Sequence, residues 1–122
     1  MRENMVVLVT GASSGVGLAS ARTFAERGHR VVMAARSRER LDAEATAIGP
    51  GAHPAACDVS DPVSVDALFA GIRKAHGRLD AVFNNAGLAA PPRDAGDLPF
   101  EDWRRVLSVN LDGAFLVASA AF

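Results

Sequence analysis

The sequence predicts an α/β protein built on a doubly wound parallel sheet, and two patterns support this prediction. Short apolar runs alternate with helix-forming stretches, which is typical of strand–helix units whose strands run parallel. A glycine-rich segment, Thr10 to Gly17, joins the first apolar run to the first helical stretch. Because crossovers between parallel strands are right-handed, the predicted strand order is 3-2-1-4, the first part of the order 3-2-1-4-5-6. We expect residues 1–122 to form one such unit, truncated before the later strands.

The apolar runs and the periodic stretches between them give the individual elements. Strands are predicted near residues 5–10, 30–35, 53–57 and 79–84. Helices are predicted near residues 16–27, 38–48, 62–76 and 99–122. In the last helix only Ser119 is polar between Gly113 and Phe122. We expect one side of that segment to face the sheet and the other to need a further helix or subunit.

Composition and charge exclude several classes of function. Apolar residues make up 49% and charged residues 22% of the chain, as in soluble globular proteins. Thirteen basic and fourteen acidic side chains nearly cancel, so neither nucleic acid nor a membrane surface is expected as a partner. The single Cys57 excludes an internal disulfide, and the three histidines lack metal-ligand spacing, so we expect a cytoplasmic protein without a metal site.

The glycine-rich segment between the first strand and the first helix predicts an anion site. Gly11 permits a tight turn, Gly15 lets a phosphate approach the backbone, and Gly17 lets the helix pack closely on the strand. The free N–H groups and the positive dipole end of the helix point at the same place. The glycine spacing departs from the G-x-G-x-x-G fingerprint, and an ordinary strand-to-helix turn is the alternative.

Arg36 follows the second predicted strand, where dinucleotide-binding sheets recognise the adenosine ribose. An acidic residue there would favour NAD, but the strand ends in two alanines, so the arginine favours NADP. The alternative is that Arg36 belongs to a solvated basic helix start, and this is how we interpret Arg38 and Arg40.

Polar residues also follow the third and fourth strands. Asp58 either accepts the adenine amino group or caps the next helix, for which Asp61, just before Pro62, is the better candidate. Asn84 and its successors, through Gly87, either tie the fourth strand to its neighbours beside a flat ligand or form a plain turn. Within the last helix, Asn110 alone would be read as a satisfied buried amide.

Together these motifs resemble the short-chain dehydrogenase/reductase family, over essentially the whole chain. The resemblance is carried by the runs Thr10-Gly11-Ala12-Ser13-Ser14-Gly15-Val16-Gly17, Asp58-Val59, Asn84-Asn85-Ala86-Gly87 and Ser108-Val109-Asn110. It implies a Rossmann fold that binds NADP, with NAD less favoured. It assigns cofactor binding to Thr10, Gly11, Ser13, Ser14, Gly15, Val16, Gly17, Arg36, Asp58, Val59, Asn85, Ala86 and Gly87. Some members carry a basic residue at the position of Ser14, so the NADP preference depends mainly on Arg36.

The resemblance also implies hydride transfer between nicotinamide and a small alcohol or carbonyl substrate. Of the family's catalytic residues only the asparagine maps onto this chain, as Asn110, whose side chain is expected to bind a water while the helix kinks locally. The catalytic serine and the Tyr-x-x-x-Lys pair do not map, and the chain contains no tyrosine. We therefore expect an inactive, cofactor-binding half that associates with itself or with a missing C-terminal half.

Two other functions stay open at this point. One is a dinucleotide-binding module without catalysis, or an inactive fragment. The other is an epimerase or dehydratase built on the same fold, which only residues beyond this chain would reveal.

Overall fold

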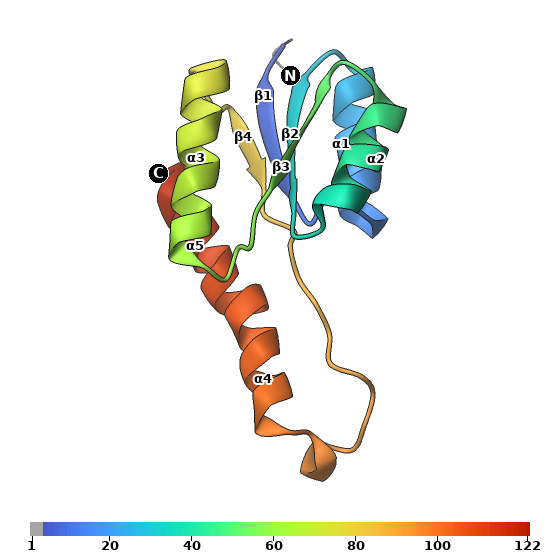
Figure 1. The fold of residues 1–122 in the computed structure, drawn as a ribbon, viewed down its shortest axis with the longest axis vertical. Coiled ribbons are helices and arrows are strands. Elements are labelled where there is room, and N and C mark those ends of the chain that lie inside the picture. The colour runs from blue at the N-terminus through green and yellow to red at the C-terminus, as the bar shows by residue number, and fades with distance from the viewer. Residues whose placement is uncertain (1–3) are drawn as a thin grey trace.

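A computed structural model describes residues 4–122 and contains a four-stranded parallel sheet in the order β3-β2-β1-β4 (Figure 1). The first three residues of the predicted unit lie outside the described residues. The strands are β1 (Val6–Thr10), β2 (Arg30–Ala35), β3 (Ala52–Ala56) and β4 (Ala81–Phe83). The helices are α1 (Gly15–Glu26), α2 (Arg38–Ile48), α3 (Pro62–His76), α4 (Phe100–Leu107) and α5 (Ala114–Ala121). The predicted fold class and strand order are confirmed.

Apolar side chains cover both faces of the sheet, because helices pack on both. All five residues of β1 are buried, and successive side chains in a strand point to opposite faces. Val6 and Leu8 join the core cluster beneath α3 and α5, whereas Val7 and Val9 join the one beneath α1 and α2. Figure 1 shows these two pairs of helices on opposite sides of the strands. A continuous apolar run is what a parallel strand covered on both faces requires.

The last predicted helix, 99–122, is divided into three parts. The α-helices α4 and α5 are joined by a π-helical turn, Ser108–Gly113, in which the backbone bonds widen from i→i+4 to i→i+5. A short 3₁₀ turn, Ala95–Asp97, precedes them in the long connection from β4. The local departure from α-helical geometry that the resemblance implied around Asn110 is therefore present.

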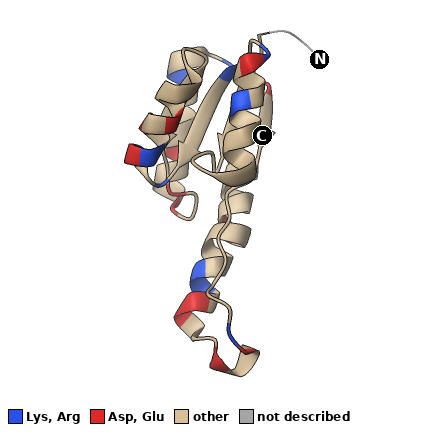
Figure 2. Ribbon diagram, turned by 90° about the vertical axis from the view of Figure 1, so that its right-hand side faces the viewer, with Lys and Arg blue, Asp and Glu red and all other residues tan. Residues whose placement is uncertain are grey.

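The segment after β4 extends away from the sheet. Figure 1 shows the connection and α4 running beyond the carboxyl ends of the strands, and Figure 2 shows both basic and acidic residues along the extension. Val117 of α5 is fully buried, but Phe115 is 67% exposed. The side of α5 that was expected to need a further partner is thus uncovered in this chain. No helix among residues 4–122 combines the length and the apolar character needed to cross a bilayer.

The hydroxyl of Thr10 ties the carboxyl end of β4 to that of β1. Thr10 is fully buried, and its Oγ1 accepts hydrogen bonds of 2.9 Å from the backbone N–H groups of both Asn85 and Ala86. The side-chain amide of Asn85 also donates to the carbonyl of Thr10, at 3.3 Å. One side chain therefore fixes the point at which the order of the sheet changes direction.

Replacing Thr10 with valine tests this tie. The substitution keeps the shape of the side chain but leaves two partly buried N–H groups without their acceptor, which destabilises a fold by about 1–3 kcal/mol. We expect chemical denaturation to show a loss of unfolding free energy of that order for Thr10→Val. Thr10→Ser, the control, keeps the hydroxyl and loses only one methyl group. Equal stability of the two variants would contradict the role assigned to the hydroxyl.

Candidate functional site

The glycine-rich turn between β1 and α1 requires glycine at three positions, two because of backbone conformation and one because of close packing. Gly11 and Gly15 have φ angles of +65° and +57°, in the left-handed region that other residues rarely adopt. A Cβ at Gly17 would overlap the carbonyl oxygen of Gly11 and lie 2.7 Å from the side-chain amide of Asn85. Beside Gly15 a Cβ would meet nothing within 4 Å, so that side of the turn is open. The turn is thus packed tightly on the sheet and bare on its outer side.

The first turn of α1 presents its N–H groups at the carboxyl edge of the sheet. Ser14 is the N-cap residue, and its side chain accepts no hydrogen bond from the helix. The first N–H groups of an α-helix have no intrahelical acceptor, so these remain available to an anion. The N–H of Ala12 donates to the carbonyl of Ala34 at 3.1 Å, which holds the turn against the end of β2.

A cleft of about 380 Å³ lies beside this turn, within the usual size range of ligand sites. The predicted site residues that line it are Gly11, Ser13, Ser14, Arg36, Val59, Asn85, Ala86 and Gly87. The remaining lining residues, which were not predicted, are Ala34, Ala35, Ser37, Cys57, Leu88 and Val109. They come from the same strand ends and from the last helix, so only the folded arrangement brings them to one wall.

The other predicted residues surround the cleft without lining it. Thr10 and Gly17 are its support, as described above, and Gly15 lies at the open side of the turn. Val16, in the first turn of α1, is 67% exposed. Gly87 approaches Asn110 closely, since a Cβ there would lie 3.2 Å from the Asn110 Oδ1.

Asp58 stands at the end of β3 beside two lining residues, Cys57 and Val59. Its Oδ1 accepts hydrogen bonds from the Ser60 hydroxyl at 2.6 Å and the Ser60 N–H at 3.0 Å. The Ser60 hydroxyl is the main cause that lowers the pKa of Asp58, assisted by the Ser60 N–H and the charge of Arg36, so the carboxyl is ionised at neutral pH. Asp61 caps α3 by accepting from the N–H of Val63 at 3.0 Å, as predicted.

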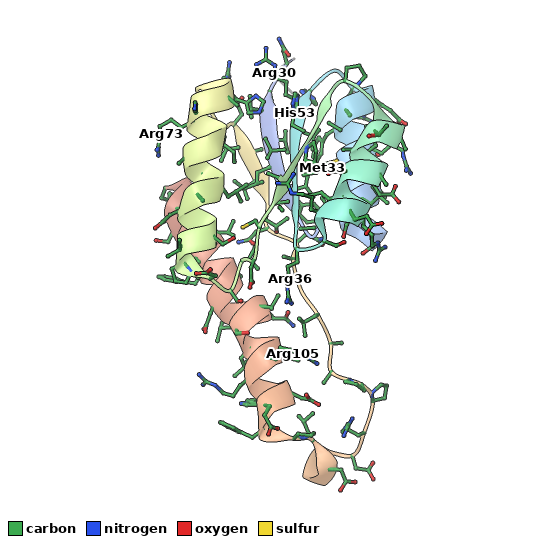
Figure 3. The ribbon with its side chains drawn as sticks, viewed as in Figure 1. Arg30, Met33, Arg36, His53, Arg73 and Arg105 are labelled. Atoms are coloured by element: carbon green, nitrogen blue, oxygen red, sulfur yellow. The ribbon has the colours of Figure 1, made fainter. Side chains whose placement is uncertain are left out.

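Arg36 lies at the end of the sheet that carries the glycine-rich turn. Figure 3 shows it beyond the carboxyl end of β2, whereas Arg30 and His53 lie at the opposite end of the strands. Burial raises the pKa of the neighbouring Cys57 thiol, which therefore stays neutral near pH 7. The cleft thus has the cation of Arg36 in its wall, the carboxylate of Asp58 beside it and the free N–H groups of α1 at its edge.

The side chain of Asn110 positions the chain segment after β4. Its Oδ1 accepts from the N–H of Leu88 at 2.8 Å, and its Nδ2 donates to the carbonyl of Leu88 at 2.9 Å. Both partners are thus backbone groups of one residue, and the water expected at this side chain stays a prediction. Asn84 makes a second bridge, donating from Nδ2 to the carbonyl of Ala114 at 2.9 Å. Both asparagines tie the end of β4 to the last helix.

This arrangement fits a phosphorylated, planar ligand better than it fits a metal ion. Among residues 4–122, no three side chains of His, Cys, Asp or Glu gather closely enough to hold a metal ion. Free N–H groups, an open glycine and an arginine are groups that recognise phosphate. The fit to a phosphorylated ligand therefore depends on backbone and charge more than on side-chain shape.

Comparison with known proteins agrees with this geometry. The family model described as short chain dehydrogenase matches residues 5–122. The D-threitol dehydrogenase of Mycolicibacterium smegmatis is 40% identical over 97% of this chain and 46% of its own length. The NADP-dependent 3-hydroxy acid dehydrogenase of Salmonella typhi is 34% identical over 95% of this chain and 47% of its own length.

A solved structure shows the same fold. The 3-ketoacyl-(acyl-carrier-protein) reductase of Brucella melitensis, complexed with NADH, matches 96% of this chain and 48% of its own, with a TM-score of 0.93 and 34% identity. The chain thus spans about half the length of the proteins it matches. On the strength of the family match, it belongs to the short-chain dehydrogenase/reductase family.

Proposed function

We propose that this chain is the NADP-binding half of an oxidoreductase, whose reaction transfers hydride between nicotinamide and an alcohol or carbonyl carbon. The observation that carries the proposal is the bare, open glycine-rich turn at the carboxyl edge of the sheet, with Arg36 at the same edge. The bound nicotinamide would supply the hydride chemistry, and the residues of this chain bind and orient.

The glycine-rich turn is the proposed pyrophosphate site. The open side of Gly15 admits the phosphates to backbone contact, and the dipole of α1 favours negative charge there. The hydroxyls of Ser13 and Ser14, which line the cleft, are further donors. Gly11 and Gly17 contribute by keeping side chains out of the turn.

The adenosine end of the ligand is proposed to lie between Asp58 and Arg36. The ionised Asp58 accepts from the adenine amino group, and the Ser60 hydrogen bonds hold its carboxyl in place. Arg36 binds the 2′-phosphate of NADP, because the end of β2 offers no carboxylate for the free 2′-hydroxyl of NAD. The NADP-dependent relative supports this preference, while the reductase solved with NADH shows that a family member binds the other nicotinamide dinucleotide.

Asn85, Ala86, Gly87 and Val59 are proposed to shape the wall on which the adenosine half lies, since all four line the cleft. Asn110 is the proposed catalytic-site residue of this chain. Its two hydrogen bonds to Leu88 support a role in holding the backbone at the cleft wall. The serine and the tyrosine–lysine pair of the family's reaction would have to come from residues beyond this chain.

Dinucleotide titration tests the ligand and its phosphate together. A charge-assisted contact stabilises a complex by about 1.5–3 kcal/mol, so Arg36→Ala should weaken NADPH binding about ten- to a hundredfold in isothermal titration calorimetry. NADH binding should change little, because its ribose carries no phosphate for the guanidinium. An unchanged NADPH-to-NADH preference in the variant would contradict the role of Arg36.

Turnover separates a catalytic half from an independent enzyme. We expect the chain alone to show negligible NADPH-dependent carbonyl reduction even when dinucleotide is bound, since it contains no tyrosine to act as the acid. The absorbance of NADPH with a panel of small aldehydes and ketones measures this. A rate comparable to ordinary enzymes would overturn the expectation. Restored turnover on adding a C-terminal half with Tyr-x-x-x-Lys would exclude the alternative of a purely non-catalytic binding module.

The uncovered apolar side chains support a proposal about association. Phe100 and Trp103 of α4, and Leu111 and Phe115 beyond it, are each more than half exposed. Such clustering is typical of an interface. We propose that the chain associates with itself or with a C-terminal half, so light scattering at micromolar concentration should report a mass above that of one chain. A monodisperse monomer would contradict this proposal.

A further inference from the structure

Arg40 lies outside the set of predicted site residues, yet the structure brings its guanidinium to the glycine-rich turn. Its Nη2 donates to the carbonyl of Ser13 at 3.4 Å, across 27 positions of the chain. Its backbone N–H donates to the hydroxyl of Ser37, the N-cap of α2, also at 3.4 Å. Ser13 and Ser37 both line the cleft, so Arg40 is anchored at two points of the cleft wall.

Within the described part of the chain, no carboxylate pairs with Arg40. Among residues 4–122, the side-chain ion pairs within 4.0 Å involve Arg22, Arg78 and Arg105, and none involves Arg40 or Arg36. A guanidinium has five N–H donors, and Ser13 takes only one of them. Four donors of Arg40 are thus available to an anion.

The position of Arg40 on its helix strengthens the argument. It lies in the first turn of α2, where the helix dipole is positive and disfavours a cation. The helix dipole therefore gives no reason for an arginine here. An anion placed at this helix start would reverse the sign of the interaction, because it would meet the dipole and the guanidinium together.

Arg38 shows that the neighbouring arginine does not share this environment. It lines a separate hollow between β3 and α3, together with His53 and Pro54. The sequence suggested one common role, as solvated charges, for Arg38 and Arg40. The structure separates them, and only Arg40 contacts the turn beside the cleft.

We propose that Arg40 is a second cation for the phosphate on the adenosine ribose, acting with Arg36. Arg36 reaches the cleft from the end of β2, and Arg40 reaches its rim from α2. Ser37, which lies between the two arginines in the sequence, lines the same cleft. A 2′-phosphate carries enough charge and enough acceptor oxygens for both guanidinium groups. The inference rests on the proposed NADP function and assigns its specificity to a pair of residues.

Calorimetric titration of NADPH and NADH into the wild type, Arg40→Ala and Arg38→Ala tests the inference. Arg40→Ala should weaken NADPH binding about five- to tenfold and change NADH binding less than about twofold. Arg38→Ala removes the same charge from the same helix start and should leave the ratio of the two affinities unchanged. Arg40→Lys should recover part of the loss. The effect of Arg40→Ala should shrink as salt rises from about 0.05 to 0.5 M.

Different outcomes separate the inference from the function on which it rests. An equal loss of NADPH and NADH binding in Arg40→Ala would mean that Arg40 only supports the turn through Ser13. An equal effect of Arg38→Ala would mean that the preference reflects total charge, and either result overturns the Arg40 assignment while the proposed function stands. Failure of the wild type to bind either dinucleotide would overturn both. Matched thermal melts of the variants exclude unfolding as the cause.

Discussion

The close approach of Gly17 to the carbonyl of Gly11 is the constraint on which the site depends. With no side chain between them, the start of α1 rests directly on the end of β1, and the Asn85 amide fills the remaining space. The hydroxyl of Thr10 then fixes the end of β4 to the same point. The free N–H groups of α1 are therefore held at the edge of a sheet whose first strand, β1, is buried along its whole length. A site made of backbone is only as rigid as the packing beneath it, and here two hydrogen-bonded side chains, those of Thr10 and Asn85, hold that packing.

The ionised side chains around the cleft keep the atoms that face solvent free to bind a ligand. Asp58 has one carboxyl oxygen engaged by Ser60, and its lowered pKa keeps it charged at neutral pH. The charge of Arg36 contributes to that lowering, after the hydrogen bonds from Ser60. The buried Cys57 between the strands stays neutral and adds no charge. At the glycine-rich turn an anion would therefore meet free N–H groups. No contact among the described residues brings a carboxylate to those groups.

Local patterns were sufficient for most of the fold, and eight of the residues that they singled out line one cleft. The bounds of β2 and α3 match the predicted 30–35 and 62–76, because apolar runs, a proline at the first helical position and the Gly77 cap mark them in the sequence. The division of the last helix was not predicted in detail, and the hydrogen bonds that Asn84 and Asn110 make around it join groups that are distant along the chain. Likewise, the hydrogen bond from Arg40 to Ser13 joins the start of α2 to the glycine-rich turn. Such a contact leaves no periodic pattern in the sequence. The sequence thus predicts the helices, the strands and the roles of the glycines. Which distant groups a long side chain contacts becomes visible only in the folded structure.

The π-helical turn changes the direction in which the later side chains of the last helix point. Val109, Gly113 and Val117 are all buried at spacings of four residues, and Gly113 fits so closely against Val59 that a Cβ would lie 2.7 Å from it. In an unbroken α-helix each such step advances the side-chain direction by about 40°, so three positions would spread over roughly 80° of the circumference. The wider turn winds more slowly and rotates the later residues back. A single wide turn thereby keeps one narrow seam aligned from Val109, at the cleft, to the fully buried Val117.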